Sequence, residues 1–157
     1  MKNKLLKVIT AIFVCLLIGF LSSFATQSSV NDWYLTLNKP SFNPPNWVFG
    51  PVWTILYILM GTAAGLVWGK GLHHLWVKTA IYHFVFQLLL NALWSIVFFG
   101  LQSPGWALLV ILALIVSIAL TIKWFKIVSK KAAYLMVPYL LWVIFAAFLN
   151  FKIWELN

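Results

Sequence analysis

The sequence has very little charge, and arginine is absent. Only 8% of its 157 residues are charged, whereas a soluble domain carries roughly 25%. All eleven basic residues are lysines, and the acidic residues are Asp32 and Glu155. Hydrophobic residues make up 64% of the chain and come in long runs. We therefore expect an integral, multi-pass membrane protein that lies in a lipid bilayer.

Several kinds of chemistry are also missing. No ionisable residue lies at the centre of an apolar run, which argues against a proton relay or an ion-coupled pump. The single cysteine, Cys15, cannot form an intramolecular disulfide. There is no phosphate-binding loop and no Ser/His/Asp set, and His73 and His74 lack a third metal ligand nearby. We expect no metal site, no required cofactor and no nucleic-acid partner.

Five apolar runs are long enough to cross a bilayer. They lie at about residues 5–25, 47–68, 79–100, 106–124 and 132–153. The first run is preceded by lysines and ends near Ser23-Phe24-Ala25, so a cleaved signal peptide is an alternative, but its length favours a retained helix. We predict one all-α domain over residues 1–157, built as a bundle of five transmembrane helices.

The lysines predict the orientation of this bundle. The N-terminus and the second and fourth connections hold nine of them, whereas the first connection and the C-terminus hold Lys39 and Lys152. Connections on the cytoplasmic side carry an excess of lysine and arginine. We therefore expect a cytoplasmic N-terminus, with the first connection on the opposite side.

The first connection, residues 26–46, is rich in proline and aromatic residues. Pro40, Pro44 and Pro45 restrict their own φ angles and bias the preceding residues away from the helical region. Asn46 is expected to cap the helix that follows. A stiff aromatic loop that leads into a membrane helix predicts a lid over the bundle.

Polar residues inside the third run point to an inward-facing surface. Gln87, Asn91 and Ser95 recur every four residues, so they share one helical face. Amides are costly in hydrocarbon unless they face protein, water or a ligand. This face must therefore point into the bundle, where it either bonds to other helices or forms a polar patch on a pocket wall.

Aromatic residues in the second and fifth runs predict the remaining walls of a pocket. Trp53 and Tyr57 share one helical face, as do Trp142 and Ala146. Such walls suit a flat, mostly apolar ligand such as a tetrapyrrole or a sterol. His83 is a conceivable haem ligand, although ordinary packing is the simpler interpretation.

Glycine recurs every four residues at Gly61, Gly65 and Gly69. A series of small residues at this spacing lets another helix approach closely. The partner is either another helix of the same chain or the same helix of a second copy. We favour packing within the chain.

The order of motifs along residues 33–157 resembles a known family. These motifs include Trp33-Tyr34, Lys39-Pro40-Ser41, Gly50-Pro51-Val52-Trp53, Gln87-Leu88, Leu90-Asn91, Gly105-Trp106-Ala107-Leu108, Pro138-Tyr139-Leu140 and Leu149-Asn150. In these features the chain is similar to the TspO/translocator protein family, also called tryptophan-rich sensory proteins or peripheral-type benzodiazepine receptors. The first apolar run contributes little to the resemblance.

The resemblance implies a five-helix bundle, commonly a homodimer, with a pocket under the first loop. It implies a membrane receptor or sensor that binds protoporphyrin IX, haem and benzodiazepine-type drugs. The alternatives are a light- and oxygen-dependent porphyrin-degrading enzyme, in which Trp53 and Trp142 would act, and a porphyrin or sterol transporter. By similarity, the ligand-binding residues would be Trp53, Tyr57, Asn91, Trp94, Trp142, Ala146 and Leu149, with Tyr34, Pro44 and Trp47 closing the pocket.

Two positions depart from the family pattern. Phe42 stands where the family usually has tryptophan, so any role of that indole is lost. The C-terminal sterol motif normally has tyrosine before a basic residue, but here Phe151 precedes Lys152. Because such motifs are weak indicators in any case, the resemblance gives little support for a sterol as partner.

Overall fold

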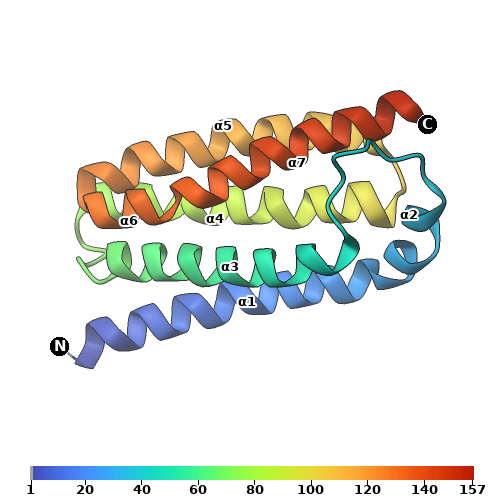
Figure 1. The fold of residues 1–157 in the computed structure, drawn as a ribbon. Coiled ribbons are helices and arrows are strands. Elements are labelled where there is room, and N and C mark those ends of the chain that lie inside the picture. The colour runs from blue at the N-terminus through green and yellow to red at the C-terminus, as the bar shows by residue number, and fades with distance from the viewer. Residues whose placement is uncertain (1) are drawn as a thin grey trace.

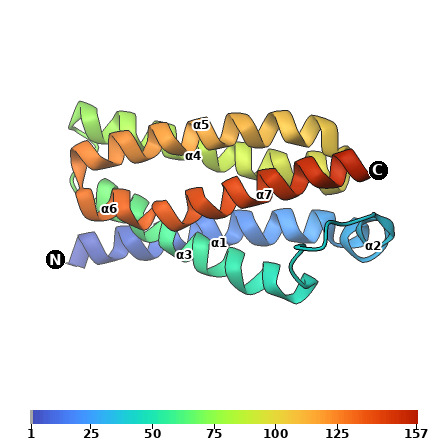
Figure 2. The ribbon, with the colours of Figure 1, turned by 45° about the horizontal axis from the view of Figure 1, so that its top comes forward.

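The computed structural model describes residues 2–157, and the described chain is all-α (Figure 1). Within these residues, five helical segments are long and apolar enough to cross a membrane. They run alongside one another as a bundle in both views (Figures 1 and 2). The elements are α1 (Lys2–Asn31), α2 (Trp33–Thr36), α3 (Asn46–Trp68), α4 (Leu75–Ser95), the π-helix η1 (Ile96–Gly100), α5 (Pro104–Val128), α6 (Lys130–Leu135) and α7 (Val137–Leu156).

The predicted fold class is confirmed, and every predicted span lies within a helical segment that is somewhat longer, although the third segment combines α4 with η1 and the fifth combines α6 with α7. A hydropathy pattern detects only the apolar centre of a helix, whereas the polar residues on either side stay helical at the membrane surface. The fifth span is divided at Met136, between α6 and α7. Pro138 explains this break, because it has no N–H to donate to the carbonyl four residues earlier.

Glycine allows α1 and α3 to pack with their backbones in contact. A Cβ atom on Gly61 would lie 2.4 Å from Ile12 Cα, and one on Gly65 would lie 2.4 Å from Val8 Cα. No larger side chain fits at either position without moving α1. The predicted packing within the chain is therefore confirmed for these two glycines, whereas Gly69 mainly faces its own helix.

The lid is shorter than the predicted loop over residues 26–46. Residues 26–31 continue α1, and α2 follows directly. The non-helical connection to α3, which forms the lid, is therefore residues 37–45. No glycine or proline occurs between Thr26 and Lys39 to end a helix earlier. The predicted cap was also wrong: Pro45 occupies the N-cap position without a side-chain bond, and Asn46 is the first helical residue.

The lid is fastened to the C-terminal end of α7. Asn38 N donates to Asn157 Oδ1 at 2.9 Å, and Asn157 Nδ2 donates to Asn38 O at 3.0 Å. Phe42 stacks on Phe148 with ring centroids 5.3 Å apart. These contacts hold the lid across one end of the bundle, at the opposite end from the N-terminus (Figure 1).

Candidate ligand-binding cavity

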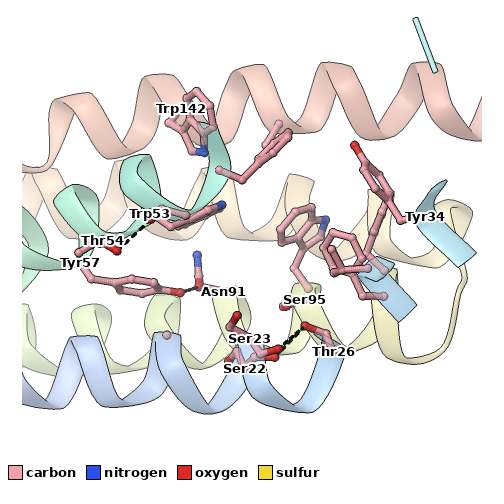
Figure 3. Close-up of a pocket in the computed structure, with 18 of the residues that line it drawn as sticks. Ser22, Ser23, Thr26, Tyr34, Trp53, Thr54, Tyr57, Asn91, Ser95 and Trp142 are labelled. Atoms are coloured by element: carbon pink, nitrogen blue, oxygen red, sulfur yellow. Dashed lines mark hydrogen bonds between the residues drawn. The ribbon is translucent and has the colours of Figure 1, made fainter. Parts of the chain in front are cut away.

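A cavity of about 600 Å³ lies inside the lid end of the bundle (Figure 3). Small-molecule pockets typically measure ~300–1,000 Å³, so this one has room for a drug-sized or tetrapyrrole-sized ligand. Its walls come from α1, α2, α3, α4, η1 and α7. The lining residues are Leu16, Gly19, Phe20, Ser22, Ser23, Thr26, Val30, Tyr34, Asn46, Phe49, Gly50, Trp53, Thr54, Tyr57, Asn91, Trp94, Ser95, Phe98, Phe99, Trp142, Ala146, Leu149, Asn150 and Ile153.

Trp53 is the centre of an aromatic wall. Its ring centroid lies 5.7 Å from that of Tyr57 and 6.4 Å from those of Trp94 and Tyr139. Trp142 faces the same cavity from α7 (Figure 3). Aromatic faces at this spacing favour offset or edge contacts with a further flat ring.

A chain of buried hydrogen bonds joins three helices beside this wall. Tyr57 Oη donates to Asn91 Oδ1 at 2.7 Å, Asn91 Nδ2 donates to Tyr139 Oη at 3.1 Å, and Tyr139 Oη donates to Gln87 Oε1 at 2.9 Å. Gln87 and Asn91 are 0% and 2% exposed. The prediction that this face of the third span points into the bundle is confirmed. The face bonds to other helices and also forms part of the cavity wall, because Asn91 lines the cavity.

A second polar link closes the cavity near the lid end. Trp94 Nε1 donates to Asn150 Oδ1 at 3.1 Å, and Asn150 Nδ2 donates to Pro104 O at 2.7 Å. The link fixes the Trp94 indole between α4 and α7. It also satisfies the amide of Asn150, which would otherwise be costly to bury.

Just before the lid, α2 contributes Tyr34 to the cavity wall. Its hydroxyl donates to Asn43 Oδ1 at 3.0 Å, and its ring lies 5.6 Å from that of Phe99. Burial raises the pKa of the Tyr34 phenol above its ordinary value of 10.0, and the bond to Asn43 partly offsets this. The phenol is therefore protonated at neutral pH, so it can donate the bond that stiffens the lid.

Ten residues were predicted to bind ligand, and the structure brings eight of them to this cavity. Their part in binding stays a prediction. Pro44 and Trp47 do not line the cavity. Trp47 is 75% exposed, because the first turns of α3 direct Asn46, Phe49, Gly50 and Trp53 inward and Trp47 outward. The eight are Tyr34, Trp53, Tyr57, Asn91, Trp94, Trp142, Ala146 and Leu149.

The sequence did not reveal the contribution of α1. Its second half supplies Leu16, Gly19, Phe20, Ser22, Ser23, Thr26 and Val30 to the lining. The available signal was the group of small polar residues at the end of an apolar run. Some residues that line the cavity are also exposed on the outside of the bundle, namely Phe20 and Ser23 on α1 and Gly50 and Thr54 on α3. The cavity therefore opens sideways between these two helices.

The π-helix η1 was also missed. It places consecutive residues, Phe98 and Phe99, on the cavity wall, with ring centroids 4.7 Å apart. The wider turn of a π-helix shifts the register of a helix, and such turns are frequent at functional sites. No composition signal in Ile96–Gly100 distinguishes it from ordinary helix.

Histidines take no part in the cavity. His83 packs on Trp124, with ring centroids 5.7 Å apart, and its Nδ1 lies 2.9 Å from Thr79 O. It is therefore not placed to ligate a haem in this cavity. Within residues 2–157, no cluster of three His, Cys, Asp or Glu side chains could hold a metal ion.

Comparison with known proteins identifies the family. The TspO/MBR family model matches residues 11–155. The Tryptophan-rich protein TspO of Chlorobaculum tepidum is 47% identical over 157 residues, which cover 100% of this chain and 99% of that protein. The Translocator protein of Homo sapiens is 42% identical over 128 residues, covering 80% of this chain and 75% of that protein. The chain thus belongs to the TspO/MBR family of multi-pass integral membrane proteins.

Proposed function

We propose that the chain is a membrane receptor or sensor that binds tetrapyrroles, such as protoporphyrin IX or haem, in the cavity under the lid. The observation that carries the proposal is the wall of three indoles, from Trp53, Trp94 and Trp142, around a space of about 600 Å³. A flat macrocycle gains stacking contacts on such a wall. Benzodiazepine-type drugs share the features that matter, namely flat aromatic rings and a few hydrogen-bond acceptors.

The chemistry of the wall supports burial of a neutral, weakly polar ring, with any charged substituent of the ligand left outside this lining. None of the lining residues within the described chain is charged, and the polar ones are hydroxyls, amides and indoles. Because no histidine faces the cavity, haem would bind there as a flat ligand without an imidazole bond to iron. Protoporphyrin IX, which needs no axial ligand, is the more suitable probe.

Absorbance of the purified protein with protoporphyrin IX, in darkness and under illumination, tests this function. Saturable binding in darkness, with a shifted Soret band and quenched tryptophan fluorescence, is the expected result. Linear, non-saturating uptake that equals uptake by empty detergent micelles would contradict it. Loss of the Soret band under light and oxygen, but not in darkness, would indicate degradation as well as binding.

Light-dependent porphyrin degradation is the second candidate, because Trp53 and Trp142 face one cavity from α3 and α7. Phenylalanine keeps an aromatic face but is much harder to oxidise than tryptophan. Losing one stacked contact weakens binding by about tenfold at most, at ~0.5–1.5 kcal/mol per contact. Trp53→Phe and Trp142→Phe should therefore keep most of the affinity and lose light-dependent conversion. Bleaching at the parent rate in both variants would rule out a role of these indoles.

Orientation and assembly form part of the proposal. The N-terminus and the two connections that together hold nine lysines lie at the same end of the bundle, which supports a cytoplasmic N-terminus. Gly61 and Gly65 are used within the chain, so a homodimer would have to form through another face. Transport of porphyrin or sterol would use the same cavity, but no feature of the described residues favours it over binding.

A further inference from the structure

The lysines at the two ends of the bundle differ in what surrounds them. At the lid end, Lys39 Nζ donates to Leu37 O at 3.1 Å, and Lys152 Nζ donates to Glu155 Oε2 at 2.6 Å. The opposite end carries nine lysines, but both acidic residues of the chain, Asp32 and Glu155, lie at the lid end. Within the described residues, no carboxylate pairs with a lysine at that opposite end.

Four of these lysines lie together where α5 ends and α6 begins. Lys123 and Lys126 are on the last two turns of α5, and Lys130 and Lys131 open α6 after the single connecting residue Ser129. We call these four lysines the lysine hairpin. All four are exposed, and none is hydrogen-bonded or paired with an acidic side chain in the part of the chain that the structure describes. Like charges this close in sequence repel one another unless an anion lies between them.

Other lysines at the same end are partly engaged by the protein. Lys7 Nζ donates to Trp68 O at 3.4 Å and lies 5.7 Å from the centroid of the Trp68 ring. Lys78 Nζ lies 5.9 Å from the centroid of the Tyr82 ring. An aromatic face attracts a cation placed over it. The lysine hairpin has no such contact, so its charge is available to a partner outside the chain.

Two tryptophans place the lysine hairpin at the membrane surface. Trp124 lies between Lys123 and Lys126 in sequence and stacks on Trp76 of α4, with ring centroids 5.9 Å apart. Trp76 is 55% exposed, so this pair reaches the outside of the bundle. Tryptophan is enriched where hydrocarbon meets the lipid headgroups, and lysine side chains near that level extend toward the phosphate groups. Lys123 and Lys126 are within one helical turn of this level.

Apolar side chains beside the lysines favour a lipid over a soluble anion. Ile127 is 56% exposed between the lysines of α5 and those of α6, and Tyr134 is 69% exposed one turn into α6. An acyl chain can cover these side chains while its headgroup meets the ammonium groups. Basic residues next to membrane helices attract anionic lipids, whereas a free phosphate would leave the apolar surface uncovered.

We propose that the lysine hairpin binds the headgroup of an anionic phospholipid, such as phosphatidylglycerol, in the leaflet at this end of the bundle. These lysines then do more than orient the chain, because they select a class of lipid at one place on its surface. The inference depends neither on the ligand cavity nor on which side of the membrane this end faces.

Lipid binding by the purified full-length chain in neutral detergent micelles tests the inference. Phosphatidylglycerol and phosphatidylcholine with the same acyl chains are titrated separately, and native mass spectrometry gives the fraction of protein with lipid bound. The variants are Lys123→Gln/Lys126→Gln and, with the charge kept, Lys123→Arg/Lys126→Arg. The matched control is Lys4→Gln/Lys70→Gln, which removes two exposed lysines from α1 and from the loop after α3.

The parent should bind phosphatidylglycerol about tenfold or more tightly than phosphatidylcholine. One lysine near a charged membrane surface is worth about fivefold in affinity. Lys123→Gln/Lys126→Gln should therefore lose about 5- to 25-fold for phosphatidylglycerol and keep the parent's affinity for phosphatidylcholine. The arginine pair and the Lys4→Gln/Lys70→Gln control should both bind phosphatidylglycerol within about threefold of the parent. Added salt should weaken phosphatidylglycerol binding alone, because it screens charge.

Equal affinity of the parent for the two lipids would overturn the inference and leave the lysines a role in orientation alone. An equal loss in the glutamine pair and the control would overturn it too, because overall charge and not the lysine hairpin would then attract the lipid. Displacement of phosphatidylglycerol by an equal concentration of inorganic phosphate would assign the site to a soluble anion instead. Lys130→Gln/Lys131→Gln, with the same expected loss, covers the case in which the first glutamine pair impairs folding.

Discussion

Replacing Asn91 by leucine should destabilise the bundle, because this one side chain joins three transmembrane helices. Asn91 on α4 accepts from Tyr57 on α3 at 2.7 Å and donates to Tyr139 on α7 at 3.1 Å. Leucine has a similar size but can make neither bond. The change therefore removes the polar links while it largely preserves packing.

The expected loss follows from the two bonds. A hydrogen bond between membrane helices contributes ~0.6 kcal/mol on average and ~1.7 kcal/mol at most, so two bonds set a range of about 1.2–3.4 kcal/mol. Tyr139 Oη keeps its bond to Gln87 at 2.9 Å. Tyr57 Oη loses its acceptor, but it fronts the cavity. We expect a loss in the lower half of the range, about 1.2–2.3 kcal/mol of unfolding free energy.

Unfolding in mixed micelles of increasing SDS content, followed by tryptophan fluorescence, measures this loss. Tyr82→Phe is the matched control, since Tyr82 lies on α4 and is 62% exposed; it should change stability by less than about 0.5 kcal/mol. Asn91→Leu and Tyr57→Phe break the same bond, so the double variant should cost less than their sum. If Asn91→Leu costs no more stability than the control, the hydrogen bonds of Asn91 do not hold the helices together.

Three further outcomes are expected. Gly65→Ala should destabilise the protein by about 1–3 kcal/mol or more in the same unfolding assay, because the new Cβ would lie 2.4 Å from Val8 Cα. Gly50→Ala is the control and should be nearly neutral, because its Cβ would meet nothing within 4 Å. Trp47→Ala should leave protoporphyrin affinity within twofold of the parent, since Trp47 faces away from the cavity; a tenfold loss would show that the lid closes further on binding. A reporter fused after Asn157 should be active only outside the cytoplasm, and cytoplasmic activity would reverse the proposed orientation.

The sequence was sufficient to predict the features that depend on local pattern. Long apolar runs predict membrane helices whatever their neighbours are, so the ends of the five spans are correct to within about six residues. Amides inside the third span have to avoid lipid, which is why the inward direction of Gln87 and Asn91 could be predicted. The glycine pair at Gly61 and Gly65 likewise indicated a close helix contact.

Features that depend on contacts distant in sequence could not be predicted in this way. The first helix is apolar around most of its surface, so nothing in its pattern shows which face Gly19 or Thr26 presents to the cavity. The outward direction of Trp47 follows from the rotation of α3, which is set by its packing on α1. The bonds between Asn38 and Asn157 join residues 119 positions apart, and no local motif marks either partner.

The most direct test of the proposed site fills the cavity from within. Ala146 is buried at 7% exposure and lines the cavity, whereas Ala113 is exposed on the outer groove between α4 and α5. Protoporphyrin IX is titrated in darkness against the parent, Ala146→Phe and Ala113→Phe, each first shown to be folded by its circular dichroism. Saturable binding that Ala146→Phe weakens at least tenfold and Ala113→Phe leaves unchanged is the predicted result. Equal affinity of all three proteins would contradict binding in this cavity.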